Sequence, residues 1–324
     1  MYDVITVGSS VIDVFADTDS ELIRIQTKTS KEDLIAYPAG DKILIKSLNF
    51  TTGGGGTNTA VSLKNLGFKV AYLGKVGNDN NGKRILDLLK KDKIDFIGSR
   101  GKEMSGYSIV LDSIAHDRTI LVYKGCNDNL KFSEINKKKL KTKWFYFSSM
   151  LKESFKTLEK LADYAEKNNI KIAFNPSSYL AEKGKNYLKK VLSKTDILIL
   201  NDEEAGYVVG KESVNDCLKD LHKLGPNIVV ITQGKKGASA FDGKNFYSIK
   251  SHKIKVVEST GAGDAFASSF LAGIIKKNDI KFALKLGLAN SESVITHHGA
   301  KHKLLSWKEG LKSIKKNPSK VKRW

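Results

Sequence analysis

The stretch from Glu258 to Phe266 reads ESTGAGDAF and places two glycines and a carboxylate in front of an apolar helical pattern. Apolar residues recur at helical spacing from Phe266 to Ile275, which predicts one buried helix face. The preceding residues, Ile254 to Val257, have the pattern of a short strand. The spacing therefore predicts that Gly261 to Asp264 form a turn from a strand into a helix.

Such a turn suits phosphoryl-group chemistry. The free N–H groups of a first helical turn and the helix dipole favour an anion, which Gly261, Ala262 and Gly263 would bind through their backbone. A carboxylate beside an anion needs a reason, and the economical one is that Asp264 takes a proton from a hydroxyl group attacking phosphorus. For this segment alone, an ordinary helix cap with Thr260 as N-cap is the alternative.

A second glycine cluster occupies residues 53–56, between a strand-like run and a helix that stops at Gly67. Four consecutive glycines leave backbone N–H groups uncovered, and Asn58 adds both a donor and an acceptor. No Gly-Lys-Ser/Thr follows, which excludes a P-loop, and the spacing does not fit a dinucleotide fingerprint. The cluster alone is typical of a flexible turn, but paired with the distant Gly-Ala-Gly-Asp it favours a ligand site.

The composition indicates an ordinary soluble protein. A chain of 324 residues with 40% hydrophobic content can bury a sizeable core in one large domain or two modest ones. No apolar run reaches the roughly 18 residues of a transmembrane helix, and the N-terminus lacks a signal-peptide pattern. Two cysteines, Cys126 and Cys217, do not make a disulfide framework. We therefore expect a cytoplasmic protein with no membrane partner.

The formal net charge is +20, which raises the question of a polyanionic partner. The lysines are scattered along the chain, and no aromatic residues interleave with the lysine runs as a nucleic-acid stacking surface needs. The pattern favours solvated lysine-rich faces, and we expect no specific nucleic-acid partner.

Short β-rich runs alternate with helical patterns, which is typical of an α/β fold around a parallel sheet. The strand-like runs are Val4–Val7, Val70–Leu73, Trp144–Phe147, Ile172–Phe174, Ile197–Leu200 and Ile228–Thr232. The helical patterns are Gly82–Lys91, Phe155–Lys167, Asn186–Ser193, Val214–Leu224 and Lys281–Thr296. Two regions break this alternation: Val14 to Thr52, and Tyr107 to Tyr123, which reads as a hairpin with its turn at Ser113 to Asp117. Together they predict a small antiparallel sheet.

The ordered motifs resemble those of the ribokinase-like (PfkB-type) carbohydrate and nucleoside kinase family over nearly the whole chain. The motifs that carry the resemblance are Gly8–Asp13, Gly53–Asn58, Asp117–Asn127, Leu200–Ala205, Ile231–Ala238 and Thr260–Asp264. The resemblance implies a three-layer α/β sandwich with a mostly parallel central sheet and a small antiparallel β lid. The implied kinase core comprises residues 1–13, 53–102 and 124–324, and the implied lid comprises residues 14–52 and 103–123.

The family's activity is ATP-dependent phosphorylation of an alcohol group on a sugar or sugar derivative, which agrees with Asp264 as general base. The resemblance assigns acceptor binding to Asp13, Gly54, Gly55 and Asn58. It assigns nucleotide binding to Asn201, Glu204, Thr232, Gly234, Gly237 and Asn290. Glu204 would bind Mg²⁺ through water. The implied partners are ATP and a small-molecule sugar or nucleoside, and two copies could pair through the lid as a homodimer.

Two departures from the family pattern bear on cations and substrate. Glu258 stands where many relatives have an aspartate in a monovalent-cation loop, which leaves potassium dependence open. No acidic residue occurs in Phe147–Met150, where ribose kinases of the family hold ribose, so ribose is not favoured as the acceptor.

A nucleoside kinase of the same fold remains the alternative, and a non-catalytic sugar- or nucleotide-binding regulator is a further one, against which the intact Asp264 argues. His297 and His298 fall where the family shapes its adenine pocket, and as neighbours on a helix they do not predict a metal pair.

Overall fold

The computed structural model describes residues 1–18, 21–26, 31–112, 118–297 and 299–324. Within these residues ten strands form one sheet in the order β18-β17-β16-β15-β14-β13-β12-β1-β6-β8. Neighbours from β15 to β8 in this order pair in parallel, whereas β16, β17 and β18 are added antiparallel at one edge. The bounds are β1 (Tyr2–Val7), β6 (Val70–Leu73), β8 (Asp95–Phe96), β12 (Thr142–Phe147), β13 (Lys171–Phe174), β14 (Ile197–Asn201), β15 (Ile228–Thr232), β16 (Ala238–Phe241), β17 (Phe246–Ile249) and β18 (Val321–Arg323).

Helices cover both faces of this sheet, and each face has its own core. One core includes side chains of α1, α2, α8 and α9, and the other includes side chains of α3 to α7. Because alternate residues of a strand point to opposite faces, β12 sends Trp144 and Tyr146 into the first core and Phe145 and Phe147 into the second. The helices are α1 (Gly55–Asn65), α2 (Asn80–Lys91), α3 (Lys152–Lys167), α4 (Ser177–Ala181), α5 (Gly184–Leu192), α6 (Asp202–Val209), α7 (Val214–His222), α8 (Ala262–Lys277), α9 (Ile280–Val294) and α10 (Trp307–Lys316).

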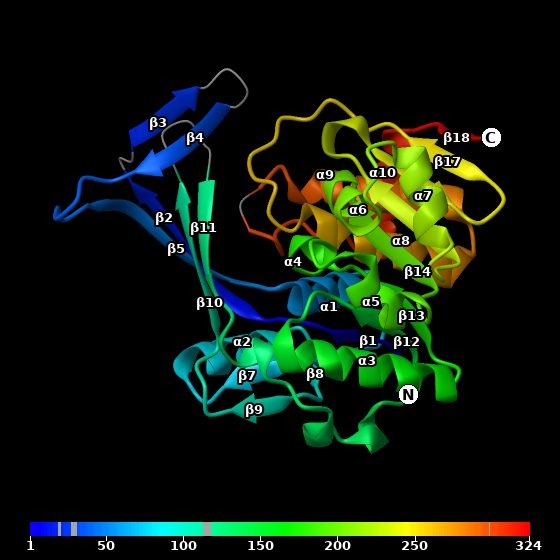
Figure 1. Ribbon diagram of the computed structural model, residues 1–324, viewed down its shortest axis with the longest axis horizontal. Helices are drawn as coiled ribbons and strands as arrows, with labels where there is room; N and C mark the ends of the chain where they lie inside the picture. Colours follow the sequence, from blue (N-terminus) through cyan, green and yellow to red (C-terminus); the bar gives the residue numbers. More distant parts are fainter. Residues whose placement is uncertain (19–20, 27–30, 113–117, 298) are drawn as a thin grey trace.

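A small sheet, defined here as β11-β10-β2-β5, stands beside the main body (Figure 1). Its strands come from the two regions that break the alternation along the chain, as predicted: β2 (Val11–Thr18), β5 (Ile45–Gly53), β10 (Gly106–Asp112) and β11 (Arg118–Tyr123). Two of its three strand pairs are antiparallel, whereas β2 and β10 run parallel. The predicted turn at Ser113 to Asp117 lies outside the described residues. Whether this sheet closes over a substrate stays a prediction.

Two further strand pairs complete the described elements. β3 (Glu21–Gln26) pairs with β4 (Lys31–Ala36) at the tip of the small sheet in Figure 1, and β7 (Lys75–Gly77) pairs with β9 (Ser99–Gly101). Among the described residues, no helix has both the length and the apolar character needed to cross a membrane.

The six predicted strand runs and the five predicted helical patterns all fall on observed elements of the same type. The strand predicted at Ile254 to Val257 is wrong, because these residues form an irregular segment. Val256 and Val257 are each 45% exposed, so their side chains are not buried in a sheet. The N–H groups of Val257 and Glu258 both donate to the carbonyl oxygen of Ile295, at 2.8 and 3.2 Å. This segment is thus held by the end of α9 rather than by a neighbouring strand.

Candidate active site

The two glycine motifs meet in space at the N-termini of α1 and α8. Asn58, in the first turns of α1, donates a hydrogen bond from Nδ2 to Asp264 Oδ2 in the first turn of α8, at 2.8 Å. These residues are 206 positions apart in the chain. The motifs predicted to bind the acceptor and the phosphate therefore lie together, with Asp264 at the point of contact.

Several neighbouring groups act on the pKa of the Asp264 carboxyl group, in opposite directions. Burial raises the pKa of its carboxyl group above the ordinary value. The hydrogen bond from Asn58 and the positive charge of Lys301 act in the opposite direction, because both favour the carboxylate. Asn58 and Lys301 are thus the two groups that favour the carboxylate form of this half-buried side chain.

Gly55 makes room next to this carboxylate. A Cβ atom at this position would lie 2.1 Å from Ser148 Oγ and 3.5 Å from Asp264 Oδ1. Any larger residue would therefore collide with Ser148 and narrow the space beside Asp264. Gly54, the other glycine predicted to bind the acceptor, is the N-cap of α1.

The turn before α8 fits against the loop after α9. Gly261 is the N-cap, with φ of 80°, and a Cβ there would lie 2.4 Å from Ala300 Cβ. Both the backbone conformation and the close contact favour glycine. No side chain caps α8, so the alternative of Thr260 as an ordinary N-cap is wrong.

The donors expected to bind a phosphoryl group are only partly free. The N–H group of Ala262 donates to the carbonyl oxygen of Ser259 at 3.2 Å. A Cβ on Gly263 would have no atom within 4 Å, so this part of the helix end faces open space. The hydroxyl of Thr260 is buried and has no hydrogen-bond partner.

Asp13 lies on β2, and its carboxylate accepts a hydrogen bond from the hydroxyl of Ser108 on the neighbouring strand β10. Burial raises the pKa of Asp13, the Ser108 hydrogen bond and Lys301 lower it, and the charge of Glu258 raises it. Asn58 Oδ1 is also buried without a hydrogen-bond partner. A carboxylate and an unsatisfied amide oxygen are the acceptors that sugar hydroxyl groups require.

A cavity of about 440 Å³ connects the predicted nucleotide residues with the helix end of Asp264. Its lining includes Asn201, Glu204, Thr232 and Gly234, together with Gly261, Gly263 and Asp264. The first group follows the carboxyl ends of the neighbouring parallel strands β14 and β15. Ligands of open α/β sheets bind at this edge.

Asn201 and Glu204 form a capping box at the start of α6. The N–H group of Glu204 donates to Asn201 Oδ1 at 2.7 Å, and the N–H group of Asn201 donates to Glu204 Oε2 at 2.9 Å. Burial raises the pKa of Glu204, and the negative charges of Glu203 and Asp264 raise it further, against hydrogen bonds from Asn201 and Ser178. The capping hydrogen bond uses Oε2 of Glu204 and fixes the orientation of the carboxylate, while Oε1 is not part of the cap.

Three residues that the sequence associates with the nucleotide lie away from the cavity lining. Asn290 is fully buried, and its Nδ2 group donates to Ser269 Oγ at 2.7 Å while its Oδ1 accepts from the Leu305 N–H at 2.8 Å. Its polar atoms are therefore satisfied within the protein. Gly237 ends the short turn after β15, with φ of 103°. His297 is exposed, and His298 lies outside the described residues.

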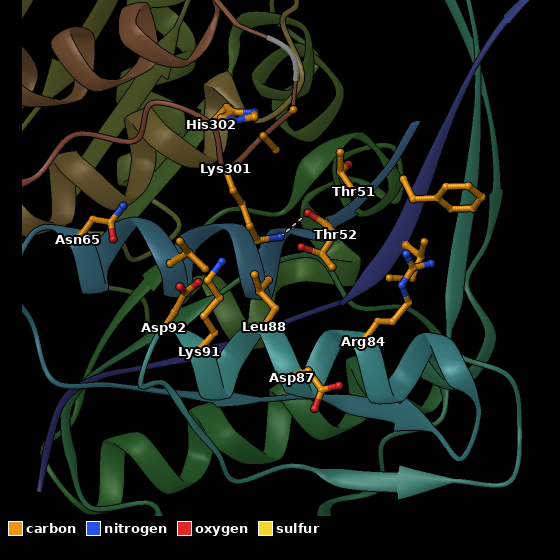
Figure 2. Close-up of a pocket in the computed structure, with 15 residues that line it drawn as sticks. Thr51, Thr52, Asn65, Arg84, Asp87, Leu88, Lys91, Asp92, Lys301 and His302 are labelled. Atoms are coloured by element: carbon orange, nitrogen blue, oxygen red, sulfur yellow. Dashed lines mark hydrogen bonds between the residues drawn. The ribbon is translucent and has the colours of Figure 1, made fainter. Parts of the chain in front are cut away.

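Lys301 is a component of the site that the sequence analysis missed. Its Nζ donates to the carbonyl oxygen of Thr52 at 2.5 Å and to Thr57 Oγ1 at 3.2 Å. Figure 2 shows it reaching from the loop after α9 to the end of β5, at the wall of a second cavity of about 760 Å³. Ile12 and Phe50 line that cavity, and Asp13 points to the other face of β2 because it follows Ile12. A lysine in a loop gives no periodic signal, so only the fold reveals it.

Glu258, which stands where many members of the family have an aspartate, is buried. Its Oε2 accepts a hydrogen bond from the N–H group of Gly299 at 2.9 Å. The carboxylate thus joins the segment before α8 to the loop that carries Lys301.

Comparison with known proteins identifies relatives over nearly the whole chain. The model of the pfkB family carbohydrate kinases matches residues 1–307. The chain is 29% identical over 308 residues to an ATP-dependent 6-phosphofructokinase of Thermoanaerobacterium thermosaccharolyticum, covering 92% of this chain and 89% of that protein. The structure of Arabidopsis thaliana ribokinase complexed with ribose and ATP has a TM-score of 0.82 at 21% identity, covering 97% of this chain and 99% of that one.

The nucleoside kinase of Methanocaldococcus jannaschii, an archaeal member of the ribokinase family, has a TM-score of 0.79 at 22% identity, with 97% and 99% of the two chains covered. These two structural likenesses concern the fold, and they confirm the predicted ribokinase-like α/β architecture.

Proposed function

Because the chain belongs to the pfkB family of carbohydrate kinases, we propose that it transfers the γ-phosphoryl group of ATP to a hydroxyl group of a sugar or sugar derivative, with Asp264 as general base. The observation that supports this most is the position of Asp264. It contacts Asn58 of the acceptor motif on one side, and it lines the cavity of Asn201, Thr232 and Gly234 on the other. A group at this junction is within reach of both reactants.

In this proposal each polar group of the site has a distinct task. Asp13 and Asn58 Oδ1 accept hydrogen bonds from hydroxyl groups and so orient the acceptor. Asp264 receives the proton of the attacking hydroxyl group, which general-base catalysis requires to lie within hydrogen-bond reach. The N–H groups at the start of α8 stabilise negative charge on the transferred group. Gly261 is needed because it brings this helix end against the loop of Lys301.

Magnesium fits this site as an ion held mostly by water and phosphate. Among the residues that the structure describes, no group of three His, Cys, Asp or Glu side chains could hold a metal. Glu204 is a buried carboxylate on the lining of the nucleotide cavity, and it would contact the hydrated ion through water. Bound Mg²⁺ would neutralise charge on the phosphate oxygens. We assign no step to a monovalent cation.

The small sheet is proposed to cover the acceptor and to contact a second copy of the chain. Several of its apolar side chains are about half exposed: Leu48, Phe50, Ile120, Leu121 and Tyr123. Asp13 and Ser108 belong to its strands β2 and β10, so movement of the sheet would move acceptor contacts. Exclusion of water on closure would limit ATP hydrolysis.

An acceptor screen tests the proposed function. Purified protein, ATP and Mg²⁺ are combined with sugars, sugar phosphates, polyols and nucleosides, and ADP formation is followed together with the phosphorylated product. We expect a product from a sugar or sugar derivative. Transfer to a nucleoside alone would favour the alternative acceptor class. ATP and sugar binding without transfer to any acceptor, under conditions that support a related kinase, would contradict the proposed activity.

A further inference from the structure

We propose that Lys301 is a positioning residue of the reaction, whose ammonium group joins the loop after α9 to the acceptor motif and brings a positive charge to the site of Asp13 and Asp264. This inference rests on the proposed function, because it concerns the residues assigned to the acceptor and to the general base. No motif of the sequence indicates it, and it follows from contacts between segments that are far apart in the chain.

The contacts of Lys301 fix the start of α1. Its Nζ binds Thr52, which precedes the glycine cluster, and Thr57, which follows it. The Thr57 hydroxyl in turn donates to the carbonyl oxygen of Gly53 at 2.6 Å. One side chain therefore holds both ends of the segment that carries Gly54 and Gly55.

The position is electrostatically unusual for a lysine that only anchors a loop. The N-terminus of a helix carries partial positive charge and favours anions, so a cation at the first turn of α1 is disfavoured by the helix dipole. The negative charges of Asp13 and Asp264 offset this cost. In return the ammonium group lowers the pKa of both carboxyl groups, against the effect of their burial. The positive charge of Lys301 is therefore stabilised by the carboxylates of Asp13 and Asp264 and not by the end of the helix.

The charge of Lys301 is itself finely balanced. Burial lowers the pKa of its ammonium group to about 8, while Asp13, Asp264 and Asp92 favour the charged form. Asp13 of β2, Asp264 of α8 and Asp92 after α2 act on its charge directly. The other charged or titratable side chains that line its cavity are Arg84, Asp87 and Lys91 of α2 and His302 of its own loop. Glu258, before α8, acts on Asp13. The balance predicts that this lysine loses its proton at mildly alkaline pH.

Two substitutions at Lys301 test the charge: arginine keeps it, and methionine removes it together with the hydrogen bonds to Thr52 and Thr57. The wild-type kcat/KM for the best acceptor of the screen should fall above about pH 8, as Lys301 is deprotonated. Lys301→Arg keeps a positive charge at all accessible pH and should shift this alkaline limb beyond the measured range. Lys301→Met should remove the limb, move the acid limb to higher pH because Asp264 loses its counter-charge, and lower kcat about 10- to 100-fold.

Lys303→Met is the matched control, since Lys303 is exposed on the same loop and should leave the profile unchanged. If wild type, Lys301→Arg and Lys301→Met share one pH profile while the acceptor is still phosphorylated, the inference fails and the proposed function stands. If the wild type phosphorylates no acceptor, the proposed function fails. The electrostatic environment of Lys301 is then tested by thermal unfolding of the wild type and Lys301→Met at several pH values.

The unfolding measurement does not depend on activity. A lysine with a native pKa of about 8 releases its proton before the unfolded chain does at about 10.4. The unfolded state then binds more protons, so wild-type stability must rise relative to Lys301→Met as pH increases from 8 to about 10. A stability difference that stays constant over this pH interval would overturn the electrostatic placement of Lys301.

Discussion

Replacing Asn58 by alanine should shift the pH dependence of the reaction by an amount that follows from one contact. Asn58 Nδ2 donates to Asp264 Oδ2 at 2.8 Å, and this bond opposes the effect of burial on the pKa of Asp264. A hydrogen bond to a charged group contributes about 1.5–3 kcal/mol, and 1.36 kcal/mol corresponds to one pKa unit. Asn58→Ala should therefore raise the pKa of Asp264 by about 1–2 units.

The sign of the effect is fixed by which form of Asp264 is active. A general base acts as the carboxylate, so a raised pKa removes the active form at a higher pH than in the wild type. The acid limb of kcat/KM should move upward by about 1–2 pH units. Asn58→Asp should move it further, because a second carboxylate next to Asp264 disfavours ionisation of the pair.

The assay is the initial rate of ADP formation at saturating ATP, with the acceptor varied, across the acid range of pH. Asn65→Ala is the matched control, because Asn65 is an exposed residue at the end of the same helix. Its acid limb should coincide with that of the wild type. If the acid limb of Asn58→Ala also coincides with the wild-type limb, the ionisation of Asp264 does not limit the reaction and the reasoning is refuted.

Three further predictions concern the acceptor, the helix end and the small sheet. Asp13→Ala should raise KM for the acceptor about 10- to 100-fold with little change in KM for ATP; equal changes in both would contradict its role. Gly261→Ala should lower the unfolding free energy by at least about 1 kcal/mol and abolish activity, because the alanine must adopt φ of 80° and its Cβ would collide with Ala300. Gly263→Ala is the control and should leave stability intact, because a Cβ there meets no atom within 4 Å. Equal unfolding midpoints for the two variants would show that the contact of Gly261 with Ala300 is not tight. Hydrogen exchange in β10 and β11 should slow when the best acceptor binds, and unchanged exchange at saturation would exclude the small sheet as a substrate lid.

The sequence predicts the central α/β body well because its elements are strongly periodic. Buried runs such as Ile197–Leu200 and Ile228–Thr232 have few polar residues, and parallel strands covered on both faces require this. Glycine motifs next to these runs then fall at the carboxyl edge of the sheet without further information. The sequence identifies Asp264 and Asn58 as candidate site residues for the same reason, since each lies in a glycine motif at the start of a helix.

Features that depend on contacts between distant segments could not be predicted in this way. Ile254 to Val257 has the residue types of a strand, but the segment finds its backbone partner at Ile295 rather than in a sheet. Asn290 has the polarity of a ligand residue, and only its neighbours Ser269 and Leu305 show that its amide is already satisfied. Lys301 is one of many lysines in the sequence, and its role depends on the position of its ammonium group between β5 and α1.

The most direct test of Asp264 as general base is the Asp264→Asn variant, measured for both turnover and ATP binding. The substitution keeps the shape of the side chain and removes the ability to take a proton, so kcat on the best acceptor should fall about 10²- to 10⁴-fold. The dissociation constant of ATP should remain near the wild-type value, because Asp264 is not needed to hold the nucleotide. Asp216→Asn, which neutralises an exposed first-turn carboxylate of α7, should retain full activity. A wild-type kcat for Asp264→Asn would contradict the proposed mechanism.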